Sequence, residues 1–366
     1  MAIKINWQDL LKRYINWQEI VRVYKNGGQI RPETVPPVWW DYLCFTAEES
    51  NSSVGLKRNS ISTDLRLEIS YDKSSWTDYT IWNTITLANV WDKVYMRNKS
   101  ETQTVFSINQ SLYYSFTMTW KIWASGDVNY LLCKNSTTSV GCFYGLFMWC
   151  SSLTRSPELP ATTLAESCYS HMFDGCSSLA TAPQLPATEV GSNSYEYMFS
   201  WCTSLTTAPE LPATTLANRC YENMFLGCTS LTTAPELPAT TLMSNCYNSM
   251  FSWCTSLTTI PQLPATTVVN RCYESMFSWC TSLTTIPQLP ATTMTFGCYQ
   301  LMFQSCTSIK ISETQTWEYQ TPYRIPSSWT WTDYPYSTQW MLLGTWWTFT
   351  GTPSINTTYY TSNQVI

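Results

Sequence analysis

The cysteines of this chain recur at a fixed interval, which raises the question of what chemistry they do. The sequence has 15 cysteines in 366 residues. One set is spaced by 26 residues at every step and comprises Cys150, Cys176, Cys202, Cys228, Cys254, Cys280 and Cys306. A second set lies eight residues before the first and comprises Cys142, Cys168, Cys220, Cys246, Cys272 and Cys298, with Ser194 in the third place. Such cysteines can bind a metal, form disulfides or fill an apolar core.

Metal binding fits this pattern poorly. The spacing within one unit is C-x7-C, whereas structural zinc sites use closely spaced cysteine pairs or clustered histidines. His171 is the only histidine of the chain. We therefore expect no metal and no other cofactor.

Disulfides remain as an alternative to free thiols. Cysteines at i and i+8 on one helix would lie roughly 12 Å apart, which is too far for a bond. Cysteines of successive units come close enough, but the N-terminus shows no secretory signal and the cysteine count is odd. Ser194 replaces one cysteine without any other change in its unit. We expect unreacted thiols that pack as small apolar side chains in a repeated core.

The elements that position these cysteines repeat with the same period. Two further residue types keep it, namely Phe147, Phe173, Phe199, Phe225, Phe251, Phe277 and Phe303, and Pro160, Pro186, Pro212, Pro238, Pro264 and Pro290. Seven units without an insertion predict a solenoid, in which each unit is too small to bury its own core. Within a unit, Cys220, Met224 and Cys228 fall at i, i+4 and i+8, which predicts one face of a short helix. The following "SLTT" favours a strand, and "APELP" ends its pairing because proline lacks an N–H donor.

The motif "MFLGCTSL" resembles the BspA-type leucine-rich repeat, whose units end in an aromatic residue, two variable residues, Cys, two more and Leu. The resemblance covers about residues 140–310, although the family usually has an apolar residue where Cys220 stands. It implies a leucine-rich-repeat solenoid. It also implies a surface role, since such repeats are found on bacterial and protist surface proteins and on gut bacteriophage particles.

Tryptophan occupies a variable position directly before the second cysteine of each unit. The residues there are Trp149, Gly175, Trp201, Gly227, Trp253, Trp279 and Ser305. A packed core does not accept Gly, Ser and Trp in one place, so we expect the indoles to project outward. Trp149, Trp201, Trp253 and Trp279 then form a candidate aromatic face for binding a glycan or a protein.

A second interpretation of the tryptophans stays open. Trp82, Trp91, Trp346 and Trp347 stand in turns where glycine would be preferred. Tryptophan and glycine codons differ by one base, so a coding peculiarity could scatter tryptophan over turns without any function.

Catalysis by the repeats is not expected. One position of the unit holds Glu158, Gln184, Glu210, Glu236, Gln262 and Gln288. A general acid or nucleophile cannot be exchanged for an amide and still work. We therefore expect this position to lie on a solvent-exposed rim of the repeats. With a single histidine and no glycine-rich phosphate loop, we expect a protein that is not an enzyme.

Residues 1–36 read as a small basic anchor module, with six Lys/Arg against three acidic residues. Its "VRVYKNGGQIRP" stretch predicts a hairpin that turns at Asn26–Gly28. We expect this module to dock on a virion capsid or tail protein. The docking candidates are Trp7, Leu11, Tyr14, Trp17 and Tyr24.

The rest of the chain reads as three regions. Residues 40–133 contain several short predicted strands, typical of a β-sandwich. Residues 140–309 are the solenoid, and residues 310–366 are a C-terminal cap or β tip. The predicted fold class is therefore mixed α/β, with a BspA-type solenoid of seven 26-residue units behind a β-sandwich and an anchor.

The net charge and the hydropathy of the chain limit the kinds of partner that it could bind. The net charge of −5 excludes a general nucleic-acid binder. No apolar run approaches the roughly 20 residues of a membrane helix, so no membrane insertion is expected.

The missing export signal, the anchor module and the resemblance together predict a bacteriophage virion surface protein, such as a head fibre, decoration protein or tail appendage. It would be assembled in the host cytoplasm as a homo-oligomer, such as a trimer, and would bind host or mucus glycan or protein. The alternative is a leucine-rich-repeat adhesin on a bacterial cell surface.

Overall fold

The computed structural model describes residues 23–25, 28–30, 42–59, 65–99, 111–131, 140–325, 328–329, 337–345, 353–354 and 357–362. The chain divides into two units, Met1–Trp40 and Asp41–Ile366. In the first unit, strands β1 (Val23–Lys25) and β2 (Gly28–Ile30) pair antiparallel with Val23 opposite Ile30, which confirms the predicted hairpin. Of the docking candidates, Tyr24 lies in β1, whereas Trp7, Leu11, Tyr14 and Trp17 lie outside the described residues.

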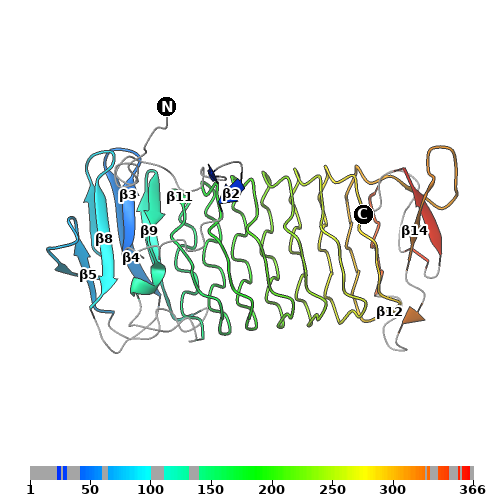
Figure 1. Ribbon diagram of the computed structural model, residues 1–366, viewed down its shortest axis with the longest axis horizontal. Helices are drawn as coiled ribbons and strands as arrows, with labels where there is room; N and C mark the ends of the chain where they lie inside the picture. The colour runs from blue at the N-terminus through cyan, green and yellow to red at the C-terminus, as the bar shows by residue number, and fades with distance from the viewer. Residues whose placement is uncertain are drawn as a thin grey trace. The chain divides into compact units, whose positions relative to one another are not determined.

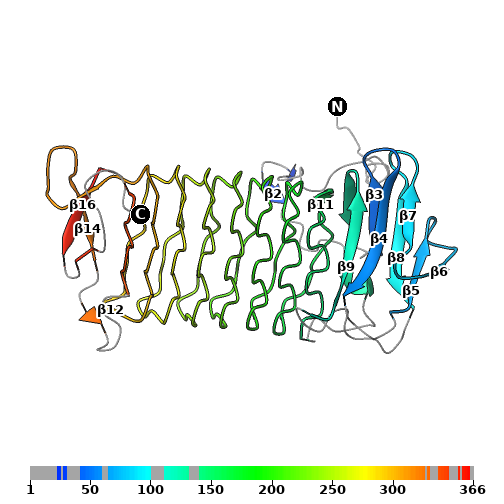
Figure 2. The same cartoon turned by 180° about the vertical axis from the view of Figure 1, so that it is seen from behind.

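The second unit begins with two open sheets. The larger sheet has the order β11-β10-β3-β8-β5-β6, and the smaller one has the order β7-β4-β9 (Figures 1 and 2). Their strands are β3 (Leu43–Ala47), β4 (Ser52–Asn59), β5 (Leu67–Ser70), β6 (Thr77–Tyr79), β7 (Thr84–Leu87), β8 (Lys93–Asn98), β9 (Tyr113–Thr119), β10 (Ile122–Ser125) and β11 (Leu153–Arg155). A 3-10 helix, η2 (Val128–Leu131), follows β10.

The larger sheet continues directly into the repeats. Strand β11 belongs to the first coil, and it pairs parallel with β10 through Ile122 and Leu153. The rings of Phe116 and Phe147 stack with centroids 5.1 Å apart, so the sheets and the first coil share one core. The prediction of a β-sandwich in residues 40–133 is therefore wrong. Hydrophobic residues on the last strands are covered by the first coil and not only by a facing sheet.

Each coil contains a nine-residue segment whose backbone hydrogen bonds alternate between two kinds of partner. Phe173 N donates to Met198 O of the next coil at 2.9 Å, whereas Met172 N donates to Tyr169 O of its own segment at 3.2 Å. Every fourth residue takes a left-handed conformation, as Ser167 (φ 56°), His171 (φ 54°) and Gly175 (φ 74°) do.

This alternation replaces the predicted helix. An α-helix bonds each N–H four residues back within one segment, but here half of the N–H groups point to the neighbouring coil. The described residues contain no α-helix, so the mixed α/β class is wrong and the unit is strand- and turn-rich. The repeats stack coil on coil as a solenoid, as expected (Figure 1).

The predicted apolar stripe is correct although its helix is not. Cys220, Met224 and Cys228 are all fully buried. Phenylalanines of successive coils stack ring on ring, for example Phe225 and Phe251 with centroids 5.5 Å apart and planes at 5°. Equivalent side chains thus meet at every coil step, which explains why each unit needs its neighbours.

The predicted strand at "SLTT" is reduced to single bridges between coils. Thr181 bridges Thr207 and Thr207 bridges Thr233 in parallel. The prolines that follow carry no N–H, so the ladder cannot extend beyond this point.

The C-terminal residues lie against the last coil. Residues 337–345 accept its hydrogen bonds, with Tyr299 N donating to Ser337 O at 2.8 Å and Phe303 N donating to Met341 O at 2.9 Å. Short strands complete this end in two sheets, of orders β12-β15 and β13-β16-β14. They are β12 (Thr293–Met294), β13 (Ile311–Ser312), β14 (Thr321–Arg324), β15 (Ser328–Trp329) and β16 (Thr358–Thr361).

Candidate functional site

Four tryptophans form the candidate binding surface, which we call the aromatic row. They are Trp149, Trp201, Trp253 and Trp279, and their exposed fractions are 64%, 45%, 43% and 37%. All four hold the same place at the end of the nine-residue segment, directly before a buried cysteine. The structure therefore places the predicted residues in one line on the surface of the coils.

The backbone at this position is left-handed in every described unit. Trp149 has φ 64° and Trp201 has φ 57°, and the equivalent Gly175 and Gly227 have φ 74° and 72°. Left-handed backbone is unusual for a bulky residue and ordinary for glycine. The position is thus a glycine-type turn that carries an indole in four units.

The indoles of Trp149, Trp201 and Trp253 lean over the same position of the following coil. A Cβ atom on Gly175 would lie 2.3 Å from Trp149 Cε3, and one on Gly227 would lie 2.6 Å from Trp201 Cε3. Where the next coil also carries tryptophan, the rings stack, as Trp253 and Trp279 do with centroids 4.6 Å apart. Glycine therefore leaves room for the ring at the two coils that follow Trp149 and Trp201, whereas Trp279 meets the ring of Trp253 by stacking on it.

All four indoles of the row are partly exposed to solvent, at steps of two, two and one coils along the stack. Aromatic faces of this kind bind apolar ligand surfaces and cations, and Tyr and Trp are enriched at protein interfaces. The arrangement is suited to binding a partner.

Tryptophans outside the row share the unusual backbone. The left-handed ones in other turns are Trp82 (φ 78°), Trp91 (φ 72°), Trp120 (φ 57°) and Trp340 (φ 53°). All four are exposed. Trp346 and Trp347 lie outside the described residues. The left-handed backbone supports the interpretation of Trp82 and Trp91 as positions where glycine would be preferred. The tryptophans of the aromatic row differ from these residues only in being aligned along the stack of coils.

A half-buried line of carboxylates lies on the same nine-residue segments. Burial raises the pKa of Glu222 from 4.5 to about 7, opposed by Arg219, whose Nε lies 3.5 Å from Glu222 Oε2. Burial also raises the pKa of Glu196 and of Glu274 in the equivalent place of other coils. In the second coil, His171 Nδ1 lies 3.0 Å from Asp174 Oδ2, and its ring stacks on Tyr197. Sequence reasoning missed this line, although Glu196, Glu222 and Glu274 recur with the period of the repeat.

The carboxylate and amide side chains at the Glu158 position are all exposed, as predicted for a solvated rim. The exposed members are Glu158, Gln184, Glu210, Glu236, Gln262 and Gln288. Among the described residues, no group of three His, Cys, Asp or Glu side chains is placed to hold a metal ion.

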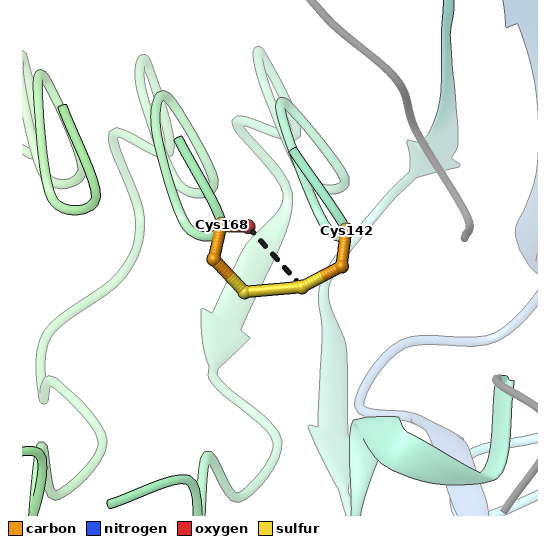
Figure 3. The surroundings of a disulfide bond; sticks show 2 residues. All are labelled: Cys142 and Cys168. Carbon is orange, nitrogen blue, oxygen red and sulfur yellow. Dashed lines mark hydrogen bonds between the residues drawn. A yellow bond between two sulfur atoms is a disulfide. The ribbon is translucent and has the colours of Figure 1, made fainter. Parts of the chain in front are cut away.

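The cysteines form two buried ladders with different contacts. In the second ladder (Cys150, Cys176, Cys202, Cys228, Cys254, Cys280 and Cys306), each thiol donates to a phenylalanine carbonyl, at 3.0 to 3.2 Å. The first ladder is the set eight residues earlier, and it begins with a disulfide between Cys142 and Cys168 (Figure 3). The expectation that all cysteines are unreacted thiols is therefore wrong for this pair. The proximity of cysteines in successive coils was expected, but the odd cysteine count was wrongly taken as evidence against a bond between them.

Comparison with family models supports the repeat assignment. The model of the BspA type leucine-rich repeat region matches residues 124–241 and 193–319, in six copies. Comparisons with curated proteins and with solved structures give no match. No helix in the described part of the chain has the length and apolar character needed to cross a membrane.

The matched residues span more than half of the chain and include the aromatic row and both cysteine ladders. The chain belongs to the BspA-type leucine-rich repeat proteins.

Proposed function

We propose that this chain is a non-enzymatic surface protein of a bacteriophage particle, with an adhesive repeat domain that binds host or mucus glycan or protein. BspA-type repeats indicate a surface adhesion-type repeat domain, and they cover more than half of the chain. The resemblance to repeats found on gut bacteriophage particles supports the particle as the surface concerned.

The aromatic row is the observation that carries the adhesive role. Its indoles are exposed, lie at one position of the coil and face solvent beside a polar backbone segment. Indole faces stack on the C–H surfaces of sugar rings and on apolar protein groups, and several weak contacts along one line add through multivalency. A repeated ligand, such as a glycan chain, fits a repeated surface.

Replacement of the row by glycine tests the adhesive role. The full chain and a variant with Trp149→Gly, Trp201→Gly, Trp253→Gly and Trp279→Gly are compared for binding to immobilised mucin glycans. We expect at least a tenfold weaker binding by the variant, because glycine keeps the left-handed backbone while removing the rings. Unchanged binding would remove the row as the adhesive surface.

Two other tryptophans supply a matched control. Trp82 and Trp91 have the same left-handed backbone and similar exposure, but they lie outside the repeats. A Trp82→Gly, Trp91→Gly variant makes the same chemical change elsewhere, and its glycan binding is expected to equal that of the parent chain.

The particle assignment has its own test. In this proposal, residues 1–36 dock on a capsid or tail protein and the repeats face outward as a homo-oligomer. Deletion of residues 1–36 is expected to abolish incorporation into purified particles, measured by mass spectrometry of the particles. Incorporation of the shortened chain would refute docking through this module.

A leucine-rich-repeat adhesin on a bacterial cell surface is the second candidate. The Cys142–Cys168 disulfide favours it, since disulfides form and persist mainly outside the cytoplasm. Antibodies against the repeats would label intact bacteria in this case, and would label purified phage particles in the first.

A further inference from the structure

We propose that two more disulfides form along the first cysteine ladder, between Cys220 and Cys246 and between Cys272 and Cys298. Together with Cys142–Cys168 they would join the coils in pairs. This inference concerns covalent modification of the repeats and does not depend on what the chain binds.

The backbone register of the bonded pair recurs at the two proposed pairs. Cys142 and Cys168 are 26 residues apart with Cα atoms at 4.8 Å, a distance suited to a disulfide. Beside them, Phe143 N donates to Cys168 O at 2.9 Å. The corresponding bond is present at both proposed pairs, from Tyr221 N to Cys246 O at 3.0 Å and from Tyr273 N to Cys298 O at 3.0 Å.

Ser194 decides which cysteines pair. It stands in the ladder after Cys168 and leaves two cysteines before it and four after it. Tyr247 N also donates to Cys272 O at 3.0 Å, so the backbone permits a bond between Cys246 and Cys272. That bond would leave Cys220 and Cys298 single, whereas the two proposed bonds use all four cysteines. Ser194 therefore divides the first ladder into two groups that each contain an even number of cysteines.

The second ladder shows what a thiol that stays reduced looks like in this fold. Cys228 Sγ donates to Phe199 O at 3.1 Å and Cys254 Sγ donates to Phe225 O at 3.1 Å. Each of these bonds uses the thiol hydrogen, which a disulfide would remove. In the first ladder, Cys298 Sγ has only a longer contact, 3.9 Å to Ser337 O, and the bonded Cys142 Sγ lies at the same distance from Cys168 O. We infer that the second ladder remains as thiols while the first becomes paired.

Burial fixes the stage at which the bonds form. All four cysteines are fully buried, and in this structure they are free thiols. Burial raises the pKa of Cys246 to about 12 and raises that of Cys272 as well, with neighbouring cysteines adding to the shift at Cys272. Few thiolates exist in the folded stack, and the thiolate is the species that attacks a disulfide. The exchange therefore takes place while the coils assemble.

The reaction needs a low-molecular-weight disulfide such as oxidised glutathione. The thiolate of Cys246 attacks it, forms a mixed disulfide and releases one glutathione thiolate. The thiolate of Cys220 then attacks the Cys246 sulfur, forms the protein disulfide and releases the second glutathione. The two protons lost by the cysteines end on the two glutathione thiols, so one small disulfide is reduced for each protein disulfide formed.

Alkylation of the full chain tests the proposal. The chain is refolded with oxidised and reduced glutathione, then unfolded in guanidinium with an alkylating reagent and no reductant, and its peptides are mapped by mass spectrometry. We expect the six cysteines of the first ladder to be protected and the seven of the second ladder to be alkylated. Alkylation of Cys220, Cys246, Cys272 and Cys298, whether or not Cys142 and Cys168 are protected, would overturn it.

Substitutions distinguish the pairings. Cys246→Ser is expected to expose Cys220 to alkylation and to leave Cys272 and Cys298 protected. Alkylation of Cys272 in this variant would show the bond to Cys246 and overturn the proposed pairs. Cys254→Ser, in the second ladder, is the matched control and is expected to leave all six protected. Ser194→Cys adds a seventh cysteine to the ladder and is expected to leave exactly one of the seven alkylated.

Discussion

The indole of Trp253 lies flat on the indole of Trp279 across one coil step, with the ring planes within 8° of each other. Both residues have left-handed backbone, at φ 63° and 64°. This backbone costs roughly 1–2 kcal/mol for a residue with a Cβ atom. A stacked aromatic pair returns about 0.5–1.5 kcal/mol beyond its burial. Stacking therefore offsets part of the backbone strain of the two residues, whereas an indole without a stacked neighbour offsets none of it.

Trp91→Gly is expected to stabilise the protein. Trp91 is exposed at φ 72°, so glycine relieves the strain and removes little packing. After allowing for the greater freedom of glycine in the unfolded chain, we expect a gain of about 0.5–1 kcal/mol in the free energy of unfolding. Guanidinium unfolding measures it, and a loss of stability would contradict the strain argument. Trp253→Gly, which also loses the stack, is expected to be close to neutral.

The coding interpretation makes a separate prediction at the left-handed tryptophans of the described residues. Peptide mass spectrometry of the protein from its natural source would read glycine at these positions if their codons are translated as glycine. The positions are Trp82, Trp91, Trp120, Trp149, Trp201, Trp253, Trp279 and Trp340. Tryptophan at all of them would exclude this explanation and leave the strain to be accounted for by binding.

Gly175→Ala is expected to be destabilising because of Trp149. The new Cβ would lie 2.3 Å from Trp149 Cε3, and the backbone is left-handed at φ 74°. We expect a loss of about 2 kcal/mol, part from overpacking and part from the backbone. The same change in a Trp149→Gly background should lose only about half as much, since the ring is gone. Equal losses in the two backgrounds would show that the contact is not felt.

Glu222 predicts a pH dependence of stability with a defined sign. Its pKa in the folded chain is raised from 4.5 to about 7, chiefly by burial. A raised pKa contributes stability that is fully present below pH 4.5 and is lost as the pH rises through about 7. Compared with the parent, Glu222→Gln is therefore expected to gain free energy of unfolding as the pH is raised across this window, by about 1–2 kcal/mol once solvent screening of a half-buried group is allowed for.

The next coil supplies the matched variant for this measurement. Asn248 stands in the place equivalent to Glu222, and its Nδ2 lies 3.4 Å from Glu274 Oε2. Asn248→Asp adds a carboxyl group to the line, and the free energy of unfolding should then fall more steeply from pH 4.5 to pH 7. Urea unfolding at several pH values measures both variants. Parallel curves for the parent and both variants would refute the role of the carboxylate line.

Met341→Asp tests the residues that cover the last coil. Met341 is buried, and its carbonyl accepts the hydrogen bond of Phe303 N. A carboxylate placed there without a partner is expected to cost about 3 kcal/mol or more. Hydrogen exchange at the amides of Phe303 and Ser305 should become faster. Met243→Asp is the control, because Met243 is exposed and its replacement should change stability by no more than about 0.5 kcal/mol.

The sequence predicted the period, the solenoid and the buried stripe, but not the backbone that builds them. Cys220, Met224 and Cys228 share a face both in a helix and in the observed segment. The two differ in their hydrogen-bond partners, since Tyr221 N donates to Cys246 O, 25 residues further along. Such a hydrogen bond forms only once the coils have stacked, so no local pattern of residues in the sequence indicates it. The left-handed positions at every fourth residue were a usable signal, because they carry Gly, Asn and Ser in several units.

The shared core of the two sheets and the first coil could not be predicted from the sequence for a similar reason. The short strands were visible, but their shared core with the first coil depends on Phe116 meeting Phe147 across unrelated segments. The proximity of Cys142 and Cys168 was predictable from the coil step, but the bond was rejected because the cysteine count of the chain is odd. The tryptophan positions, by contrast, were readable because glycine alternates with tryptophan in one place.

The hydrogen bonds that join one coil to the next run along the stack and not across it. Tension applied between the two ends would therefore load them one row at a time, and the coils would detach in sequence. The first two coils, held by Cys142 and Cys168, would leave together. If this chain connects a surface to a bound ligand, it would lengthen in steps under tension before the connection breaks.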